Sequence, residues 1–110
     1  MIEDRIQKIE DRIQAASHLP PELKAELLDV TAQLRKELLE LHSQSSEKAH
    51  AVTELTETSA NHATNPENNV PSIEKAIQEL NESVEEFEVS HPDLAAALNR
   101  MAMILANMGI

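Results

Sequence analysis

Apolar residues recur along most of the chain at the three- and four-residue spacing of one α-helical face. The most apolar stretch is the last one, residues 87–110, where the spacing predicts a helix from about Pro92 to Asn107. Apolar residues or alanines occupy nearly all of its faces, so this helix needs cover on most sides. Its predicted core or interface positions are Leu94, Leu98, Met101, Leu105 and Met108.

Both ends of this last helix carry terminal signals. Ser90, with Asp93 three residues later, has the spacing of a capping box, and Pro92 is tolerated in the first turn. Gly109 is the expected stop, because glycine readily takes the left-handed conformation that ends helices, and Ile110 can fold back onto it.

Residues 2–15 form an almost perfect seven-residue repeat, IEDRIQK followed by IEDRIQA. Its isoleucines occupy the a and d positions of a coiled coil, and Arg5 could reach Glu10 of a neighbouring parallel chain. Two heptads are too few to hold a coiled coil alone. We therefore favour packing within the chain, as one arm of a hairpin, over an intermolecular coil. The core or interface positions are Ile2, Ile6, Ile9 and Ile13.

The middle of the chain predicts two further helices. Pro20 and Pro21 break the chain and suit a new helix start, and the leucines that follow have helical spacing. From 43 to 64 the pattern weakens among serines and threonines, which indicates either a solvated extension of that helix or a frayed segment. We favour helix to about Ser59. Turn-forming residues predict a linker over 61–71, followed by a third helix, about 72–88, with a glutamate-rich outer face.

The predicted fold is therefore all-α, with about four helices at 2–16, 20–59, 72–88 and 91–108. Short connections imply antiparallel hairpins, here packed around the apolar C-terminal helix. The chain is one helical domain, 1–110, with an N-terminal hairpin in 1–60, the linker in 61–71 and a C-terminal helical pair in 72–110. Three helices do not readily cover the last one on all sides, so we expect a homodimer or higher oligomer.

Composition excludes several function classes. The net charge is −11, from 20 acidic and 9 basic residues, which disfavours nucleic acid and anionic membranes as partners. The chain has no cysteine, one glycine and one aromatic residue, so thiolate sites, glycine-rich phosphate loops and base-stacking surfaces are excluded. The C-terminal apolar run is shorter than a membrane span, and the opening residues lack the charged-then-apolar pattern of a leader, so we expect no signal peptide. We expect a cytoplasmic protein.

One candidate chemistry is a carboxylate–histidine metal site. Glu47 with His50, and Glu88 with His91, have the Glu-x-x-His spacing that ferritin-like bundles use twice. Glutamate is so frequent here that such pairs arise by chance, and the second pair straddles the predicted Ser90 cap. We therefore expect no metal and no cofactor, and keep a metal-binding four-helix protein as the alternative. For His91, which continues the apolar seam, we favour a structural role over a pH-sensitive one.

The C-terminal residues resemble a known family. The runs FEVSHP (87–92), LAAAL (94–98) and ILANMGI (104–110) are similar to the end of the small bacterial proteins grouped as domain of unknown function 4404. The resemblance implies a short all-α bacterial protein and no particular activity, so no functional residues are carried over.

These observations favour a non-enzymatic protein. Serine, histidine and aspartate are present, but no strained or glycine-flanked nucleophile accompanies them. We expect an interaction, scaffold or regulatory module that acts through the acidic face of the third predicted helix or through the C-terminal seam. Its expected partners are further copies of itself and another protein.

Overall fold

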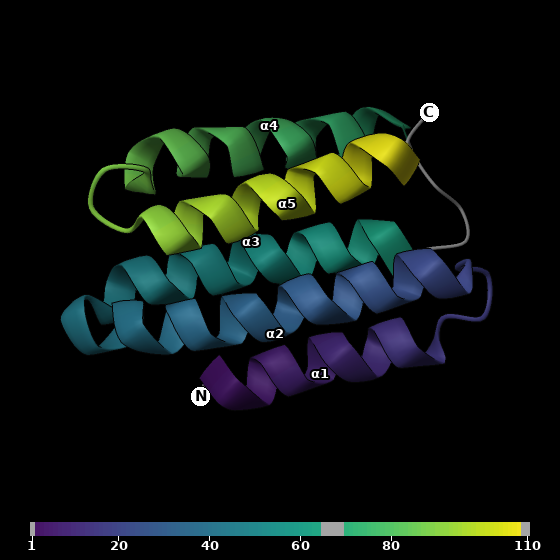
Figure 1. The fold of residues 1–110 in the computed structure, drawn as a ribbon, viewed down its shortest axis with the longest axis horizontal. Helices are drawn as coiled ribbons and strands as arrows, with labels where there is room; N and C mark the ends of the chain where they lie inside the picture. The colour runs from purple at the N-terminus through teal and green to yellow at the C-terminus, as the bar shows by residue number, and fades with distance from the viewer. Residues whose placement is uncertain (1, 65–69, 109–110) are drawn as a thin grey trace.

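The helical spacing of the apolar residues produces five helices in the part of the chain that the structure describes. The structure is a computed structural model and describes residues 2–64 and 70–108. Its helices are α1 (Ile2–Ala15), α2 (Pro21–Gln44), α3 (Ser46–Thr64), α4 (Val70–Phe87) and α5 (Pro92–Met108) (Figure 1). These two ranges contain no strand. The all-α prediction is confirmed, and the prediction of four helices is wrong by one.

The additional helix arises because the predicted long second helix breaks at Ser45. This residue is extended, with φ −154° and ψ 100°, and its backbone N–H donates to the Leu41 carbonyl, 2.7 Å away. Its side-chain oxygen lies 3.4 Å from the backbone nitrogen of Lys48, the arrangement of an N-cap. One serine therefore ends α2 and starts α3, with neither proline nor glycine to mark the turn.

The helix that follows, α3, is neither frayed nor a solvated extension. It buries a face made of small residues that repeat every three, four and seven positions. The buried hydroxyls of Thr53, Thr56 and Ser59 donate to the carbonyl four residues earlier, at 2.7, 2.9 and 2.9 Å, so no hydroxyl is left unpaired. The buried face consists of Ala49, Val52, Thr53, Thr56, Ser59, Ala60 and Ala63.

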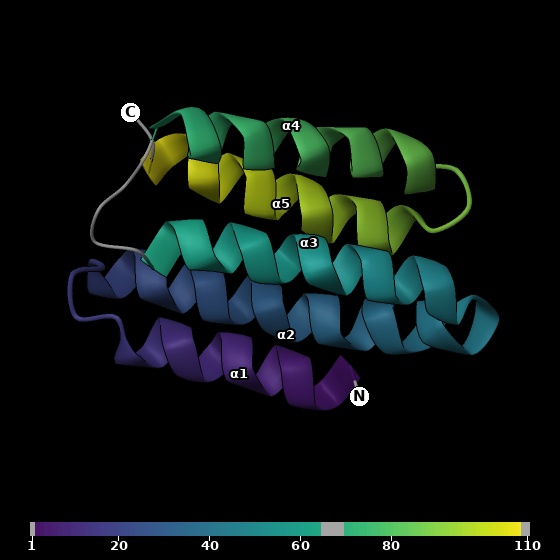
Figure 2. The same cartoon turned by 180° about the vertical axis from the view of Figure 1, so that it is seen from behind.

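The small face lets α3 occupy the centre of the molecule. α3 contacts each of the other four helices, whereas α1 contacts neither α4 nor α5. Figures 1 and 2 show the same order from both sides: the α4–α5 hairpin lies along one edge and α1 along the opposite edge. The predicted packing around the C-terminal helix holds for α2, α3 and α4, which contact α5, but not for α1, which does not. The radius of gyration, 12.9 Å, is that of one compact domain of this length.

α5 is nevertheless covered within one chain. Its leucines at 94, 98 and 105 are at most 1% exposed, and Met101 is fully buried. An exposed strip remains, on which Met103 is 59% accessible. The leucine seam is thus covered by helices of the same chain, one strip of α5 stays exposed, and the oligomeric state stays a prediction.

The ends of α5 differ in part from expectation. The helix begins at Pro92, so His91 rather than Ser90 precedes its first turn. The backbone N–H of Ala95 donates to the His91 carbonyl at 3.0 Å. The predicted stop at Gly109 and Ile110, and the side chain of Met108, lie outside the described part of the chain.

The heptads of α1 pack within the chain, which was the interpretation we favoured. Ile6 and Ile13 are fully buried and Ile9 is 5% exposed. The charged flanks also find partners inside the molecule, because Glu10 pairs with Arg35 of α2 and Arg5 pairs with Glu57 of α3. The groups that would join two coiled-coil chains thus fasten α1 to its neighbours.

The predicted linker over 61–71 is shorter than expected. Residues 61–64 are the last turn of α3, and 70–71 already belong to α4. Residues 65–69 lie outside the described part of the chain.

Candidate functional site

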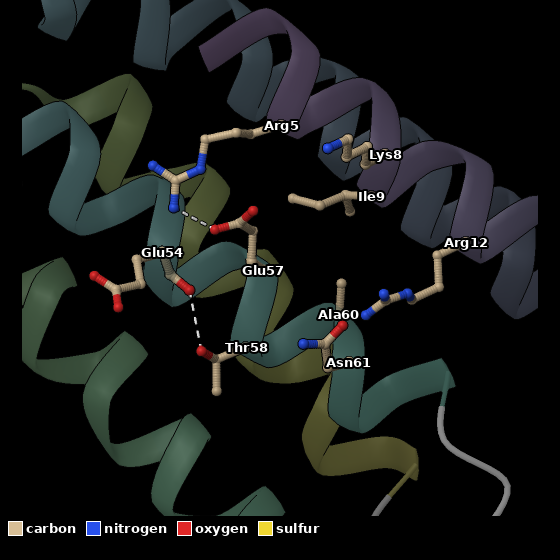
Figure 3. Close-up of a pocket in the computed structure, with 9 residues that line it drawn as sticks. All are labelled: Arg5, Lys8, Ile9, Arg12, Glu54, Glu57, Thr58, Ala60 and Asn61. Carbon is tan, nitrogen blue, oxygen red and sulfur yellow. Dashed lines mark hydrogen bonds and ion pairs between the residues drawn. The ribbon is translucent and has the colours of Figure 1, made fainter. Parts of the chain in front are cut away.

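A cleft of about 300 Å³ lies between the parallel helices α1 and α3 (Figure 3). α1 contributes three cationic side chains spaced three and four residues apart, so they share one flank of the helix. α3 contributes two glutamates at the start of the cleft and neutral residues further along. The lining residues are Arg5, Lys8, Ile9, Arg12, Glu54, Glu57, Thr58, Ala60 and Asn61.

Arg5 is paired with an acidic side chain of α3. Its guanidinium forms an ion pair with Glu57 and lies 3.4 Å from Nδ1 of His50. The hydrogen bond to Glu57 raises the pKa of Arg5, against the lowering effect of burial, and the charges of Glu57 and Glu54 add to the rise. Arg5 therefore stays charged and closes the first part of the cleft.

Lys8 and Arg12 are not matched. Neither side chain forms a hydrogen bond or ion pair with any residue in the described ranges. Figure 3 shows Arg12 extending toward Asn61 on α3. From there the cleft continues between Ala16 and Thr64. Arg12 thus faces an open part of the cleft that has neutral residues on its other wall, and Lys8 lies one turn before it on α1.

This arrangement suits anion binding better than catalysis. The hydroxyls of Thr58 and Thr64 in the cleft lining donate to their own helix, at the carbonyls of Glu54 and Ala60, 3.1 and 2.8 Å away. No histidine lines the cleft to activate either of them. The cleft therefore offers positive charge and an amide, but not a nucleophile paired with a base.

The residues of the predicted metal site are placed at helix ends and on exposed surface. Glu47 lies in the first turn of α3, and Glu88 lies just after α4. His50 contacts Arg5, and its ring packs edge-on against His42 at 5.6 Å. Across the described residues, no group of three or more histidine or acidic side chains could hold a metal ion. The two Glu-x-x-His pairs therefore do not converge.

His91 joins the α4–α5 turn to the end of α2. Its Nε2 lies 2.8 Å from Oε1 of Gln44, and its Nδ1 lies 3.0 Å from the hydroxyl of Ser90. The ring also packs edge-on against Phe87, with centroids 5.8 Å apart. His91 therefore lies between the α4–α5 turn and the C-terminal end of α2 and contacts both.

The sequence reasoning missed the cleft because it treated residues 46–59 as a continuation of the second helix and not as a separate helix beside α1. The repeat of α1 places Arg5 and Arg12 at equivalent positions, but without α3 nothing lies opposite them. A usable signal was present: Ala49, Thr56 and Ala63 are seven residues apart, as are Val52 and Ser59. A seven-residue repeat of small residues beside a seven-residue repeat of isoleucines indicates two helices that pack together.

Comparison with known proteins gives one match. A family model described as a domain of unknown function (DUF4404) matches residues 62–110. The predicted resemblance is thus confirmed over the end of α3, the α4–α5 hairpin and the C-terminal residues. No curated protein and no solved structure matches the chain. Within the described ranges, no helix has the length and apolarity needed to cross a membrane.

Proposed function

We propose that this chain, which resembles a family of unknown function over residues 62–110, acts by binding another protein and not by catalysis. The observation that carries the proposal is the outer face of α4. This helix contacts α3 and α5 on one side, and its opposite side carries an exposed row of glutamates. Exposed glutamates of the α4 region are Glu74, Glu82, Glu85, Glu86 and Glu88.

The charge on this face is strongly one-sided. Lys75 is the one basic residue in the sequence of α4. Exposed like charges repel one another at helical spacing and do not stabilise an isolated helix. A face of this kind is complemented by a partner that carries lysines or arginines, which would also be attracted by the net charge of −11.

The other surface that the sequence suggested is less suited to a partner. The C-terminal seam of Leu94, Leu98 and Leu105 is buried against helices of the same chain. A partner could reach it only after the α4–α5 hairpin had separated from α2 and α3. The acidic face of α4 needs no such opening.

Binding of a basic helical peptide tests the proposal. The peptide should carry lysines and arginines on one face, and fluorescence anisotropy should measure its affinity at low and moderate salt. The triple variant Glu74→Gln/Glu82→Gln/Glu85→Gln should weaken binding by about tenfold, since each exposed ion pair contributes roughly 0.5 kcal/mol.

A matched variant separates this face from bulk charge. Glu22→Gln/Glu26→Gln/Glu40→Gln changes three exposed glutamates of α2 and gives the same net charge. It should bind the peptide nearly as well as the wild-type chain. Equal weakening by both triple variants would show that the peptide senses only total charge, and the α4 proposal would then fail.

The interaction role leaves two predictions from the sequence unchanged. Assembly into a homo-oligomer and a cytoplasmic location in a bacterium stay predictions. Sedimentation velocity on the purified chain would measure the first directly.

A further inference from the structure

The cleft between α1 and α3 is built from two seven-residue repeats that run in parallel. In α1, Arg5 and Arg12 occupy the same position of successive repeats. In α3, the buried small residues also recur at seven-residue intervals. Arg5 lies between His50 and Glu57, which are seven residues apart, and Arg12 lies beside Asn61 and Thr64. The two helices therefore stay in register, and a step of one repeat relates the two halves of the cleft.

Acidic residues of α3 line the first half of the cleft, and neutral residues of α3 line the second half. Arg5 faces Glu54 and Glu57. One repeat later, the corresponding residues of α3 are Asn61 and Thr64. Arg12 holds the same position of the repeat as Arg5, but within the described ranges it has no carboxylate partner.

Arg12 is also exceptional among the arginines. The chain has four, and three of them bind a side chain on another helix: Arg5 binds Glu57, Arg35 binds Glu10 and Arg100 binds Asp29. Arg12 alone forms no such pair with the described residues. Lys8, one turn earlier on the same flank, adds a second unmatched positive charge to the cleft.

We propose that this second half of the cleft is a binding site for the carboxylate of a small acidic molecule. The carboxylate would stand toward Arg12 as Glu57 stands toward Arg5, accepting hydrogen bonds from the guanidinium. Lys8 would supply further positive charge, and the Asn61 amide would donate from the opposite wall. Planar guanidinium groups recognise carboxylates through paired hydrogen bonds.

Size and charge favour a small ligand over an acidic protein segment. The two parts of the cleft have volumes of about 300 and 600 Å³, which lie within the range for small-molecule sites. The net charge of −11 repels an extended acidic partner, whereas a small ligand meets mainly the local field of Lys8 and Arg12. This site is independent of the α4 face, which lies at the opposite edge of the molecule (Figure 1).

Titration followed by NMR tests the site. Succinate is added to the ¹⁵N-labelled full chain at constant ionic strength, and amide shifts are followed to about 50 mM ligand, well above a dissociation constant near 1 mM. Saturable shifts should be confined to residues around Lys8, Arg12 and Asn61. Inorganic phosphate and a short glutamate-rich peptide are titrated in parallel.

Three variants sharpen the result. Arg12→Gln should weaken succinate binding at least about tenfold. Asn61→Glu restores the acid found at Glu54 one repeat earlier, so it should also abolish binding while the helical circular dichroism stays unchanged. Lys36→Gln removes an exposed α2 lysine outside the cleft and should bind as the wild type does.

Each other outcome overturns part or all of the proposal. Absence of saturable shifts removes the site, and equal weakening in Lys36→Gln reduces it to bulk charge. Tighter binding of phosphate contradicts the assignment to a carboxylate. Tighter binding of the glutamate-rich peptide contradicts the assignment to a small molecule.

Discussion

α3 and α5 are both largely buried, yet they are built from different side chains. α5 buries leucines, Met101 and Ile104 besides three alanines, whereas α3 buries three alanines, two threonines and a serine beside a single valine. α5 is stabilised by the large apolar area that it removes from water. α3 contributes less apolar area, but its small side chains let four other helices approach it.

The buried hydroxyls of α3 show how polar residues can be accommodated in a core. The hydroxyls of Thr53 and Thr56 are fully buried, and each donates to a carbonyl of its own helix. Such a hydroxyl needs no partner from another helix, so it fills space much as a methyl group does. A threonine-rich helix can therefore lie at the centre of a bundle in which an unpaired polar group would be costly.

We expect the largest loss of stability from a charge introduced into the buried face of α5. Leu98 is fully buried in α5, and Leu98→Glu places an unpaired carboxylate among apolar side chains. We expect a loss of more than about 4 kcal/mol, comparable with the whole stability of a small domain. Circular dichroism should show loss of the cooperative thermal transition.

Asn99→Glu is the matched control for this prediction. The residue is next in sequence but exposed on α5, so its change in stability should stay within about 0.5 kcal/mol. A folded Leu98→Glu variant with a wild-type melting curve would contradict the burial of α5.

A side chain that is too large for its site should destabilise α3, since this helix buries little apolar area that a substitution could remove. Ala60 is fully buried in α3, where a leucine would push neighbouring helices apart. We expect Ala60→Leu to lower the free energy of unfolding by about 1–3 kcal/mol, measured by urea denaturation.

Two further variants separate size from polarity in α3. Ala51→Leu makes the same change on the exposed face and should be nearly neutral. Thr56→Val removes a buried hydroxyl at nearly constant volume, and its cost should be clearly smaller than that of Ala60→Leu. If Thr56→Val cost more, the hydroxyl would be a specific stabilising contact and not a space-filling group.

The same contrast explains what could be predicted from the sequence. The apolar spacing locates α1, α4, α5 and the start of α2 within a few residues, because large apolar side chains mark a buried face directly. α3 was not recognised as a separate, buried helix, because its buried serines and threonines have the composition of a solvated segment and because Ser45 turns the chain without proline or glycine. Of the candidate site, the repeat predicted where Arg5 and Arg12 lie on α1, but the opposite wall depended on α3. Glu47, His50, Glu88 and His91 share a spacing but not a location.

Both helices also carry charged contacts at their edges. Glu57 of α3 pairs with Arg5, and Arg100 of α5 pairs with Asp29 of α2, 2.7 Å apart. In the same region, burial raises the pKa of Glu37 of α2, and the negative charges of Glu40 and Asp93 raise it further, against the lowering effect of Lys36.

The smallest expected effect is therefore a pH-dependent one at Glu37. Because its pKa is raised in the folded chain, the folded state binds more protons than the unfolded state just above the ordinary glutamate pKa, about 4.3. The contribution of Glu37 to stability is thus fully present below that pH and is lost as the pH rises through the folded pKa. Glu37→Gln removes this partly buried charge, so it should raise the melting temperature at neutral pH and lose this advantage in acid. Thermal melts across this pH range, with Glu26→Gln on the exposed face of α2 as the control, measure the difference. A gain for Glu37→Gln that stayed the same at every pH would assign the effect to packing and not to charge.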